Sequence, residues 1–401
     1  MCIGWIDFSE KDRKRAIDVL HLLNEGAVDE LGIGVVRDAF ADYFFPGTST
    51  IMTRAKYFLI VPYAIKEACA KYPSDIRAVY QELEKIEKNC AQQMKEHGGQ
   101  SVIGATILPK WVVRQPSIIY WNGIRTWGLM RENLSMREAI QAEMAMVIER
   151  KQKRNNWSIE GEEGIQDDVN AGQMEGVLWN LPNSYNGKHW RENLHVELTE
   201  DEATHLKELI LGSKNPLMVC SLLRTIIEKE KEIDLVSIEE NGENSFETFA
   251  HAMKSYVSTK MWERMDMAMR FNKLVYLLRV QYNALLDNKY EERFVEERKQ
   301  YVEDIRGLDL EKMFCTMGVH GSVTTFLREA KQYVEDGKES ELKECIIERE
   351  IRLKTRKRSK ILHKELYQSQ WIGGTWLDYR LGITTRLLSD IAHPAKGGQD
   401  D

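Results

Sequence analysis

Two pairs of arginine and histidine near the end of the chain have a spacing that could support cleavage of RNA without a metal ion. Arg358 precedes His363 with four residues between them, and Arg386 precedes His393 with six. The histidine can act as general acid or base, while the guanidinium stabilises negative charge that develops on phosphorus. Charged helices also produce such spacings by chance. Arg358 and His363 therefore predict a metal-independent helical ribonuclease only as the alternative function.

The densest positive charge in the sequence surrounds the first of these pairs. The basic residues of this segment are Arg352, Lys354, Arg356, Lys357, Arg358 and Lys360. On a helix they would spread around more than half of the circumference, which suits a surface that faces phosphate groups or an acidic partner. A solvated helix balanced by Glu348 and Glu350 would explain the same charges. The segment is our first candidate for binding nucleic acid or a protein partner.

A second basic pair, Arg54 and Lys56, follows the strong breaker Pro46-Gly47. We expect a helix to begin at residues 48–50, whose Thr-Ser-Thr side chains can cap it. Arg54 and Lys56 would then lie early in the second helix of a helix-turn-helix-like segment, where a recognition helix contacts DNA. An ordinary amphipathic helix is the competing interpretation.

No residue set in the sequence predicts a cofactor or a metal ion. His189 and His195 lack a further cysteine or histidine at metal-ligand spacing. Cys2 could act as an N-terminal nucleophile, but such enzymes are built on β-rich sandwiches. Gly32-Ile-Gly34 begins a dinucleotide fingerprint in which Arg37 occupies the place of the third glycine. We expect a binding protein rather than an enzyme.

The overall composition restricts the class of protein. A net charge of −7 excludes a globally basic nucleic-acid coat, so any DNA contact must be local. The hydrophobic fraction of 43% and the charged fraction of 30% are those of a globular chain. The longest apolar run, residues 58–65, contains Pro62 and is much shorter than a membrane span. We therefore expect a folded protein that has no membrane segment.

The first residues and the cysteines indicate a cytoplasmic location. Residues 1–15 mix acidic and basic side chains and lack the apolar core of a signal peptide. The 6 cysteines lie far apart and form no Cys-x-x-Cys pair, as is usual for reduced thiols in the cytosol.

Apolar periodicity predicts an all-α, multi-helix protein with two helical domains. The N-terminal domain, residues 1–154, contains the helix-turn-helix-like segment. Ser135 with Glu138 and Thr199 with Glu202 have the spacing of capping boxes. Helices are expected over about 9–23, from 29 to the break at 46, from 48–50 onward, and over about 74–97, 117–127 and 135–153.

Residues 155–198, rich in glycine and asparagine near their start, predict a loop or linker that could dock through Trp179, Trp190 and Leu194. A C-terminal helical domain, residues 199–395, follows, and residues 396–401 are expected to be a disordered tail. Its helices are expected over about 199–210, 221–227, 237–240, 290–306, 322–336, 339–366 and 376–392, with one long helix or a pair of helices over 246–288.

Several segments taken together resemble an uncharacterised bacterial family, domain of unknown function 6361. The resemblance rests on residues 5–9, 37–42, 45–51 and 53–58, and extends to 120–128, 377–380 and 390–391. Members of this family tend to lie in prokaryotic defence islands beside helicases and phospholipase D-like nucleases. The resemblance implies an accessory or adaptor subunit of an antiphage system, which binds a helicase or phospholipase D-like nuclease encoded nearby and could also contact DNA. It implies no catalytic residues.

Overall fold

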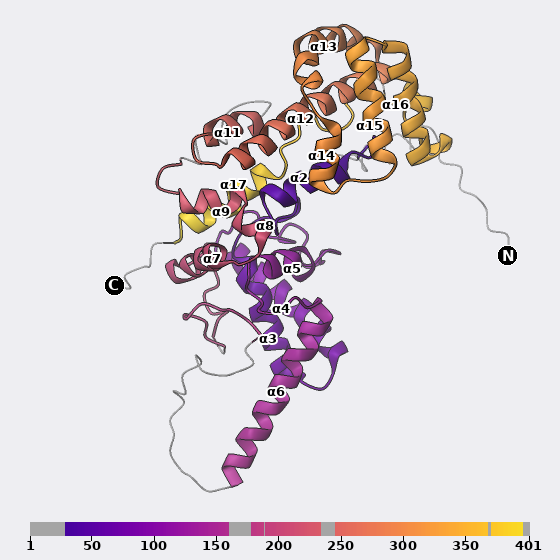
Figure 1. Ribbon diagram of the computed structural model, residues 1–401. Coiled ribbons are helices and arrows are strands. Elements are labelled where there is room, and N and C mark those ends of the chain that lie inside the picture. The colour runs from indigo at the N-terminus through magenta and orange to yellow at the C-terminus, as the bar shows by residue number, and fades with distance from the viewer. Residues whose placement is uncertain (1–28, 160–177, 188, 234–244, 368–369, 396–401) are drawn as a thin grey trace, which may run out of the picture. The chain divides into compact units, whose positions relative to one another are not determined.

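The computed structural model describes residues 29–159, 178–187, 189–233, 245–367 and 370–395 (Figure 1). Helices make up nearly all regular structure in these ranges, where the only β-pairing is an isolated antiparallel bridge between Met130 and Trp179. The predicted all-α class is therefore confirmed. The helices expected over 9–23 and 237–240 and the tail 396–401 lie outside the described residues.

The chain divides into two compact units that interleave along the sequence. The first unit combines residues 1–41 with 240–379, and the second combines 42–239 with 380–401. Distant segments meet within each unit. In the first unit, the ring centroids of Phe40 and Phe271 are 6.0 Å apart. In the second unit, Arg54 binds Asp390. This course differs from the consecutive domains 1–154 and 199–395 expected from composition, because contacts over such separations leave no local signal.

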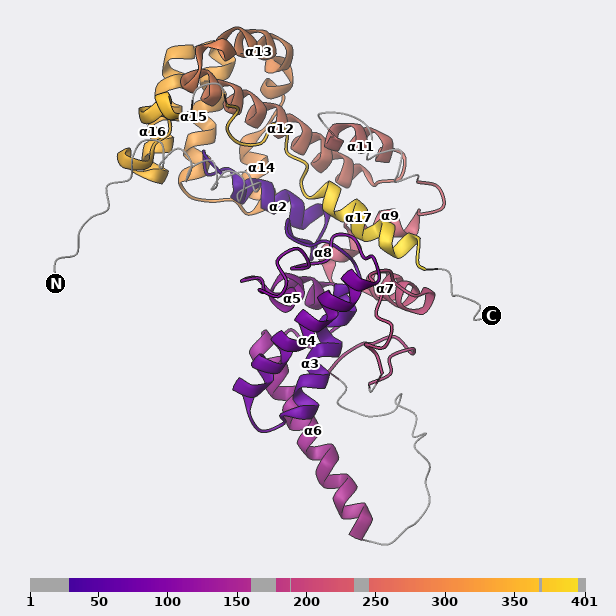
Figure 2. The same cartoon turned by 180° about the vertical axis from the view of Figure 1, so that it is seen from behind.

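The first unit is built around the long helix α12, Thr259–Leu286. Ser258 caps this helix by accepting a hydrogen bond from the Met261 amide at 3.2 Å. Apolar side chains around most of the circumference of α12 are buried, as expected for a central helix. Figures 1 and 2 show α11 beside one end of α12 and α13 beside the other, and both contact it.

The other described elements of the first unit lie on either side of α12 in sequence. Helix α2, Gly34–Phe44, begins in this unit and ends in the second. The remaining helices here are α11 (Ser245–Met253), α13 (Glu291–Arg306), α14 (Leu310–Met317), α15 (Ser322–Asp336) and α16 (Glu339–Lys354). Short 3-10 turns are η1 (Asn288–Tyr290), η2 (Arg356–Arg358) and η3 (Ile361–Leu366).

The second unit surrounds a buried aromatic cluster. Phe58 stacks on Trp127 with ring centroids 4.0 Å apart, and the Trp127 indole donates to the Pro46 carbonyl at 3.0 Å. Both predicted capping boxes are present, at Ser135 with Glu138 and at Thr199 with Glu202. The helices are α3 (Tyr57–Lys71), α4 (Ile76–Glu96), α5 (Pro116–Thr126), α6 (Met136–Ile159), α7 (Glu200–Gly212), α8 (Pro216–Val219), α9 (Leu222–Glu228) and α17 (Leu381–Ala392).

The helix expected from residues 48–50 begins later, at Tyr57, so the prediction of Arg54 and Lys56 as residues inside a helix is wrong. The Thr48 hydroxyl donates to the Phe45 carbonyl at 2.7 Å instead of capping a helix. The amides of Thr53 and Arg54 donate to the Tyr120 hydroxyl at 2.8 and 3.1 Å. A distant tyrosine therefore holds Thr53 and Arg54 in irregular backbone ahead of α3.

The long helix expected over 339–366 is also wrong in its second half. Helix α16 ends at Lys354, and Thr355 takes a φ of +68°, which no α-helix accommodates. The chain continues through η2 and η3. The basic residues of 352–360 therefore do not share one helical surface.

In the part of the chain that the structure describes, no helix combines the length and the apolar character that crossing a bilayer requires.

Candidate functional site

The structure places Arg54 in a largely buried ion pair. Its guanidinium binds the Asp390 carboxylate through Nε at 3.0 Å and Nη2 at 2.8 Å. The side chains of Arg54 and Asp390 are only 15% and 9% exposed. Asp390 also accepts the Ala55 amide at 2.8 Å. This bidentate pair ties the segment before α3 to α17, and it occupies the face of Arg54 that a phosphate would need.

Lys56 is engaged in the same way. Its ammonium lies 2.6 Å from Oε2 of Glu202, and both side chains are buried. The same carboxylate accepts the Thr199 amide at 2.9 Å and so completes the capping box of α7. Neither member of the predicted pair Arg54 and Lys56 is available at the surface.

Two of the six basic residues of the segment 352–360 belong to a buried cluster in the first unit. The cluster consists of Glu30, Tyr282, Glu350, Lys354, Ser359 and Lys360. Its two ammonium groups contact Glu30: Lys360 Nζ at 2.7 Å from Oε1, and Lys354 at Oε2. Lys354 also lies 3.0 Å from Glu350. Two lysines of the cluster thus face two carboxylates.

Glu350 organises this cluster from a fully buried position, with 0% exposure. It accepts the Tyr282 hydroxyl at 2.7 Å, the Lys360 amide at 2.9 Å and the Ile361 amide at 3.2 Å, as well as the Ser359 hydroxyl. Burial lowers the pKa of Lys354, and the like charge of Lys360 lowers it further. The Asp29 charge opposes this shift. Through its hydrogen bonds to Tyr282 and to the Lys360 amide, Glu350 holds the chain after α16 to α12.

The other four basic residues of the segment are exposed to solvent. They are Arg352, Arg356, Lys357 and Arg358, which we call the basic turn. Within the described ranges, none of these four side chains makes an ion pair. The turn consists of the end of α16 and η2, and Thr355 at positive φ separates the two elements. Of the cations predicted from the sequence, those of the basic turn are the ones available to an external anion.

The residues of the ribonuclease alternative lie in this region. Arg358 is in η2, and His363 is inside η3, where its φ of −124° departs from helical geometry. His363 is half-exposed and lies 3.8 Å from Glu365. The second pair is exposed: Arg386 is in α17, and His393 directly follows this helix, with Nδ1 3.2 Å from the Ser389 carbonyl. Neither pair lines the pocket around Arg279 or the one around Lys85 and Leu108.

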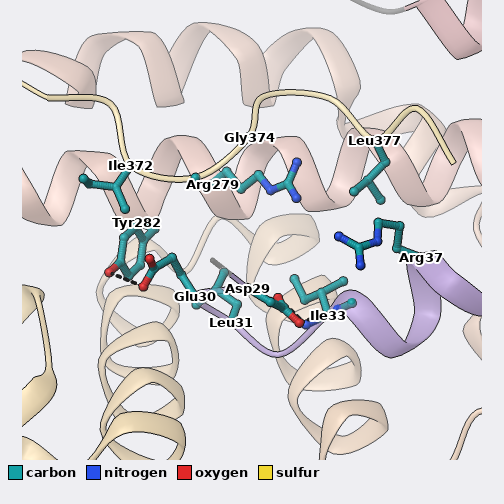
Figure 3. Close-up of a pocket in the computed structure, with 12 residues that line it drawn as sticks. Asp29, Glu30, Leu31, Ile33, Arg37, Arg279, Tyr282, Ile372, Gly374 and Leu377 are labelled. Carbon is teal, nitrogen blue, oxygen red and sulfur yellow. Dashed lines mark hydrogen bonds between the residues drawn. The ribbon is translucent and has the colours of Figure 1, made fainter. Parts of the chain in front are cut away.

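A small cavity in the first unit brings together residues that were not predicted as a site (Figure 3). It encloses about 30 Å³, room for roughly two water molecules. It is lined by Asp29, Glu30, Leu31, Ile33, Gly34, Arg37, Arg279, Tyr282, Ile372, Gly373, Gly374 and Leu377. These come from the start of α2, from one face of α12 and from the segment 372–377. We call this the arginine cavity.

Two guanidinium groups, of Arg37 and Arg279, are directed toward each other in the arginine cavity (Figure 3). Arg279 Nη1 donates to the Thr375 carbonyl at 2.8 Å, and Arg37 Nε donates to Asp38 at 3.0 Å. Burial lowers the pKa of Arg279 to about 10; the Asp29 charge opposes this shift and the Arg37 charge adds to it. The arrangement concentrates positive charge in a partly buried space.

Two buried asparagines of α12 fix the segment 372–377 over this cavity. Asn283 accepts the Ile372 amide at 2.8 Å and donates to its carbonyl at 3.1 Å. Asn272 does the same for Leu377, at 2.7 and 2.9 Å. The segment therefore runs along α12 on two paired anchors with Arg279 between them.

One sequence signal could have identified the arginine cavity. Arg279 interrupts the buried apolar run of α12 between Leu278 and Val280, and an arginine is seldom placed in such a run unless it is paired or functional. In the sequence, Arg37 differs from its surroundings only in occupying the place of the third glycine of a dinucleotide fingerprint. The described residues that precede α2 form a turn rather than a strand, which agrees with rejecting that fingerprint.

The histidines considered as metal ligands are engaged elsewhere. His189 pairs with Glu192, and His195 stacks on His97 with ring centroids 4.4 Å apart. Within the described residues no group of three or more His, Cys, Asp or Glu side chains could hold a metal ion.

Comparison with known proteins identifies one likeness. No curated protein matches the chain, and no solved structure matches it. Residues 1–139 match the model of a family of unknown function (DUF6361), so this part of the chain is similar to that family.

Proposed function

We propose that this chain is a non-catalytic accessory subunit of a prokaryotic antiphage defence system, and that its basic turn contacts the phosphate backbone of DNA. The defence setting, with a helicase or phospholipase D-like nuclease as protein partner, follows from the family resemblance. The DNA contact follows from one observation: the cations of the basic turn are exposed and make no ion pair within the described residues.

The chemistry of the basic turn supports phosphate as its target. Three of its four members are arginines, whose planar guanidinium groups bind phosphate oxygens in a bidentate manner. Because the chain has a net charge of −7 and the positive charge is local, the contact would cover only a short stretch of DNA. Such a contact would bind DNA without sequence preference and would leave recognition to the partner.

The DNA contact is tested by fluorescence anisotropy with a labelled duplex, over about 50 to 200 mM salt. The double variant Arg356→Glu and Arg358→Glu is expected to lose about tenfold or more in affinity, and the slope of log affinity against log salt should fall by about two. The matched control is Lys260→Glu with Lys299→Glu, which reverses two exposed charges on α12 and α13. Equal losses in both double variants would refute a specific role of the basic turn.

The adaptor role is tested by co-expression with the products of neighbouring genes. A stable complex with a helicase or nuclease, together with no activity of the isolated chain, is the expected result.

The same preparations test the ribonuclease alternative. Metal-free cleavage of single-stranded RNA that His363→Ala abolishes would replace the adaptor proposal with an enzyme that uses Arg358 and His363.

A further inference from the structure

We propose that Arg37 and Arg279 form a binding site for one small oxyanion, the carboxylate or phosphoryl group of a ligand whose remainder stays outside the arginine cavity. The site lies wholly in the first unit. It shares no side chain with the basic turn, so it is independent of the DNA contact proposed above.

The first argument is the supply of hydrogen-bond donors. A guanidinium group carries five N–H bonds. Among the described residues, Arg279 uses Nη1 for Thr375, and no acceptor is found for its Nε or Nη2. Arg37 uses Nε and Nη2 for Asp38, which leaves Nη1. Donors from two arginines therefore remain for a ligand.

The second argument is that the carboxylates of the cavity are already engaged. Asp29 accepts the amides of Ile33 at 2.8 Å and Gly34 at 2.6 Å, and so caps α2. Glu30 binds Lys354 and Lys360 in the buried cluster. No carboxylate of the lining bridges the two guanidinium groups, whose like charges repel. An anion between them would relieve this repulsion and supply the missing acceptors.

The third argument is size. About 30 Å³ accommodates two oxygen atoms of a carboxylate or phosphoryl group, but not a base or a sugar. The wall at Gly373-Gly374 has no side chains, and a Cβ added at Gly373 would meet no atom within 4 Å. The rest of a ligand can leave the cavity along this glycine pair.

The fourth argument is rigidity. Asn272 and Asn283 hold both ends of segment 372–377, and the Asp29 cap fixes the start of α2. Arg37 projects from α2, and Arg279 projects from α12, the helix to which both asparagines belong. A site of this kind binds without the cost of ordering its own backbone.

The experiment measures anion binding to the full chain by calorimetry and by the midpoint of thermal unfolding. The probes are inorganic phosphate and acetate, with chloride at equal ionic strength as reference. Phosphate, acetate or both should raise the midpoint above that in chloride, since a ligand of the native state stabilises it. Phosphate alone would identify a phosphoryl ligand and acetate alone a carboxylate. Equal midpoints in all three salts would overturn the proposal.

The variants separate the site from a general charge effect. Arg37→Gln should weaken anion binding by about tenfold or more, because charge-assisted hydrogen bonds are lost. Lys299→Gln removes one exposed charge from α13 of the same unit and should bind like the unaltered chain. Unchanged binding by Arg37→Gln would refute the site.

Variants of Arg279 provide a second test, with a control for loss of structure. Arg279→Gln loses the bond to Thr375, so Arg279→Lys, which keeps a cation, is measured beside it. Folded Arg279→Lys protein should bind the anion several-fold more weakly, since an ammonium replaces the bidentate fork. The basic-turn variant Arg356→Glu with Arg358→Glu should bind it normally. Loss of anion binding in that variant would instead place the site on the basic turn and overturn the assignment to the cavity.

Discussion

The segment 352–360 contains two sets of cations with opposite environments. Lys354 and Lys360 are mostly buried among carboxylates, whereas the basic turn, Arg352 and 356–358, faces solvent. Members of the two sets alternate within these nine positions, and each carries one basic group, so the sequence does not distinguish them. What separates them is whether an acid from elsewhere in the chain reaches them, as Glu30 reaches the two lysines. Charge density along a sequence therefore does not by itself locate a binding surface.

The buried set also positions the exposed one. Glu350 accepts the amides of Lys360 and Ile361, and it binds Lys354 at the end of α16. Both ends of the loop that carries residues 356–358 are thus attached to one carboxylate. The loop is held by its ends while its arginines remain free to contact an external partner.

The largest effect is expected from removing this carboxylate. Glu350→Ala removes the acceptor of the Lys360 and Ile361 amides and the shorter hydrogen bond of the Tyr282 hydroxyl. It also leaves two ammonium groups facing Glu30 alone, so the free energy of unfolding should fall by about 3 to 5 kcal/mol. Urea unfolding followed by tryptophan fluorescence measures the change. Glu348→Ala, an exposed position on the same helix, should cost less than about 0.5 kcal/mol. Similar losses in both variants would erase the distinction between buried and exposed charges.

The ion pair of Lys56 extends the comparison to the second unit. Lys56→Met should cost about 3 kcal/mol, because it leaves the Glu202 carboxylate buried without its cation. Adding Glu202→Gln should recover part of the loss, since the amide oxygen can still accept the Thr199 amide without a buried charge. Strictly additive losses in urea unfolding would show that the two side chains are not coupled.

Local signals in the sequence predicted the local features of this fold. The capping boxes at Ser135 and Thr199 depend on residues three positions apart, and both are present. The all-α class follows in the same way from periodicity. The start of α3 could not be predicted, because the hydroxyl of Tyr120 holds Thr53 and Arg54 outside the helix from a distant part of the chain.

The candidate site was predictable only in part, for the same reason. The sequence alone shows the cluster of basic residues in the segment 352–360. Glu30, which binds Lys354 and Lys360, lies far away in sequence, so the burial of these two lysines could not be predicted. The arginine cavity joins Arg37, Arg279 and the segment 372–377 across most of the chain. Partners at such separations leave no periodic or spacing signal in a single sequence.

Glu87 is a buried carboxylate for which the described residues supply no cation, in contrast to Glu350 and Glu202. Glu87 is 1% exposed and accepts the Ser117 amide at 2.6 Å, but no hydrogen-bond partner is found for its Oε2 within the described residues. Burial raises the pKa of Glu87 from 4.5 to about 7. The folded state then binds the proton more tightly than the unfolded state. Its contribution to stability is complete below pH 4.5 and is lost as the pH rises through about 7.

Glu87→Gln should therefore stabilise the protein at about pH 8 by roughly 1 to 3 kcal/mol. The substitution should have little effect at a pH where the Glu87 carboxyl is protonated in both the folded and the unfolded state. The amide keeps an acceptor for the Ser117 amide and offers a donor to the Ser117 hydroxyl, which lacks a partner in the described structure. Urea unfolding at low and high pH measures the difference. An equal effect at both pH values would mean that the carboxyl does not titrate on folding.

The smallest effect on stability is expected where the effect on binding is largest. Arg356→Glu with Arg358→Glu should change the free energy of unfolding by less than about 0.5 kcal/mol, because neither side chain has an ion pair to lose among the described residues. The same variant should lose most of its DNA affinity, as proposed above. A loss of stability comparable to that of Glu350→Ala would show that the basic turn is part of the fold. Stability and affinity measured on one pair of variants thus separate the cations that hold the chain together from those that remain for a partner.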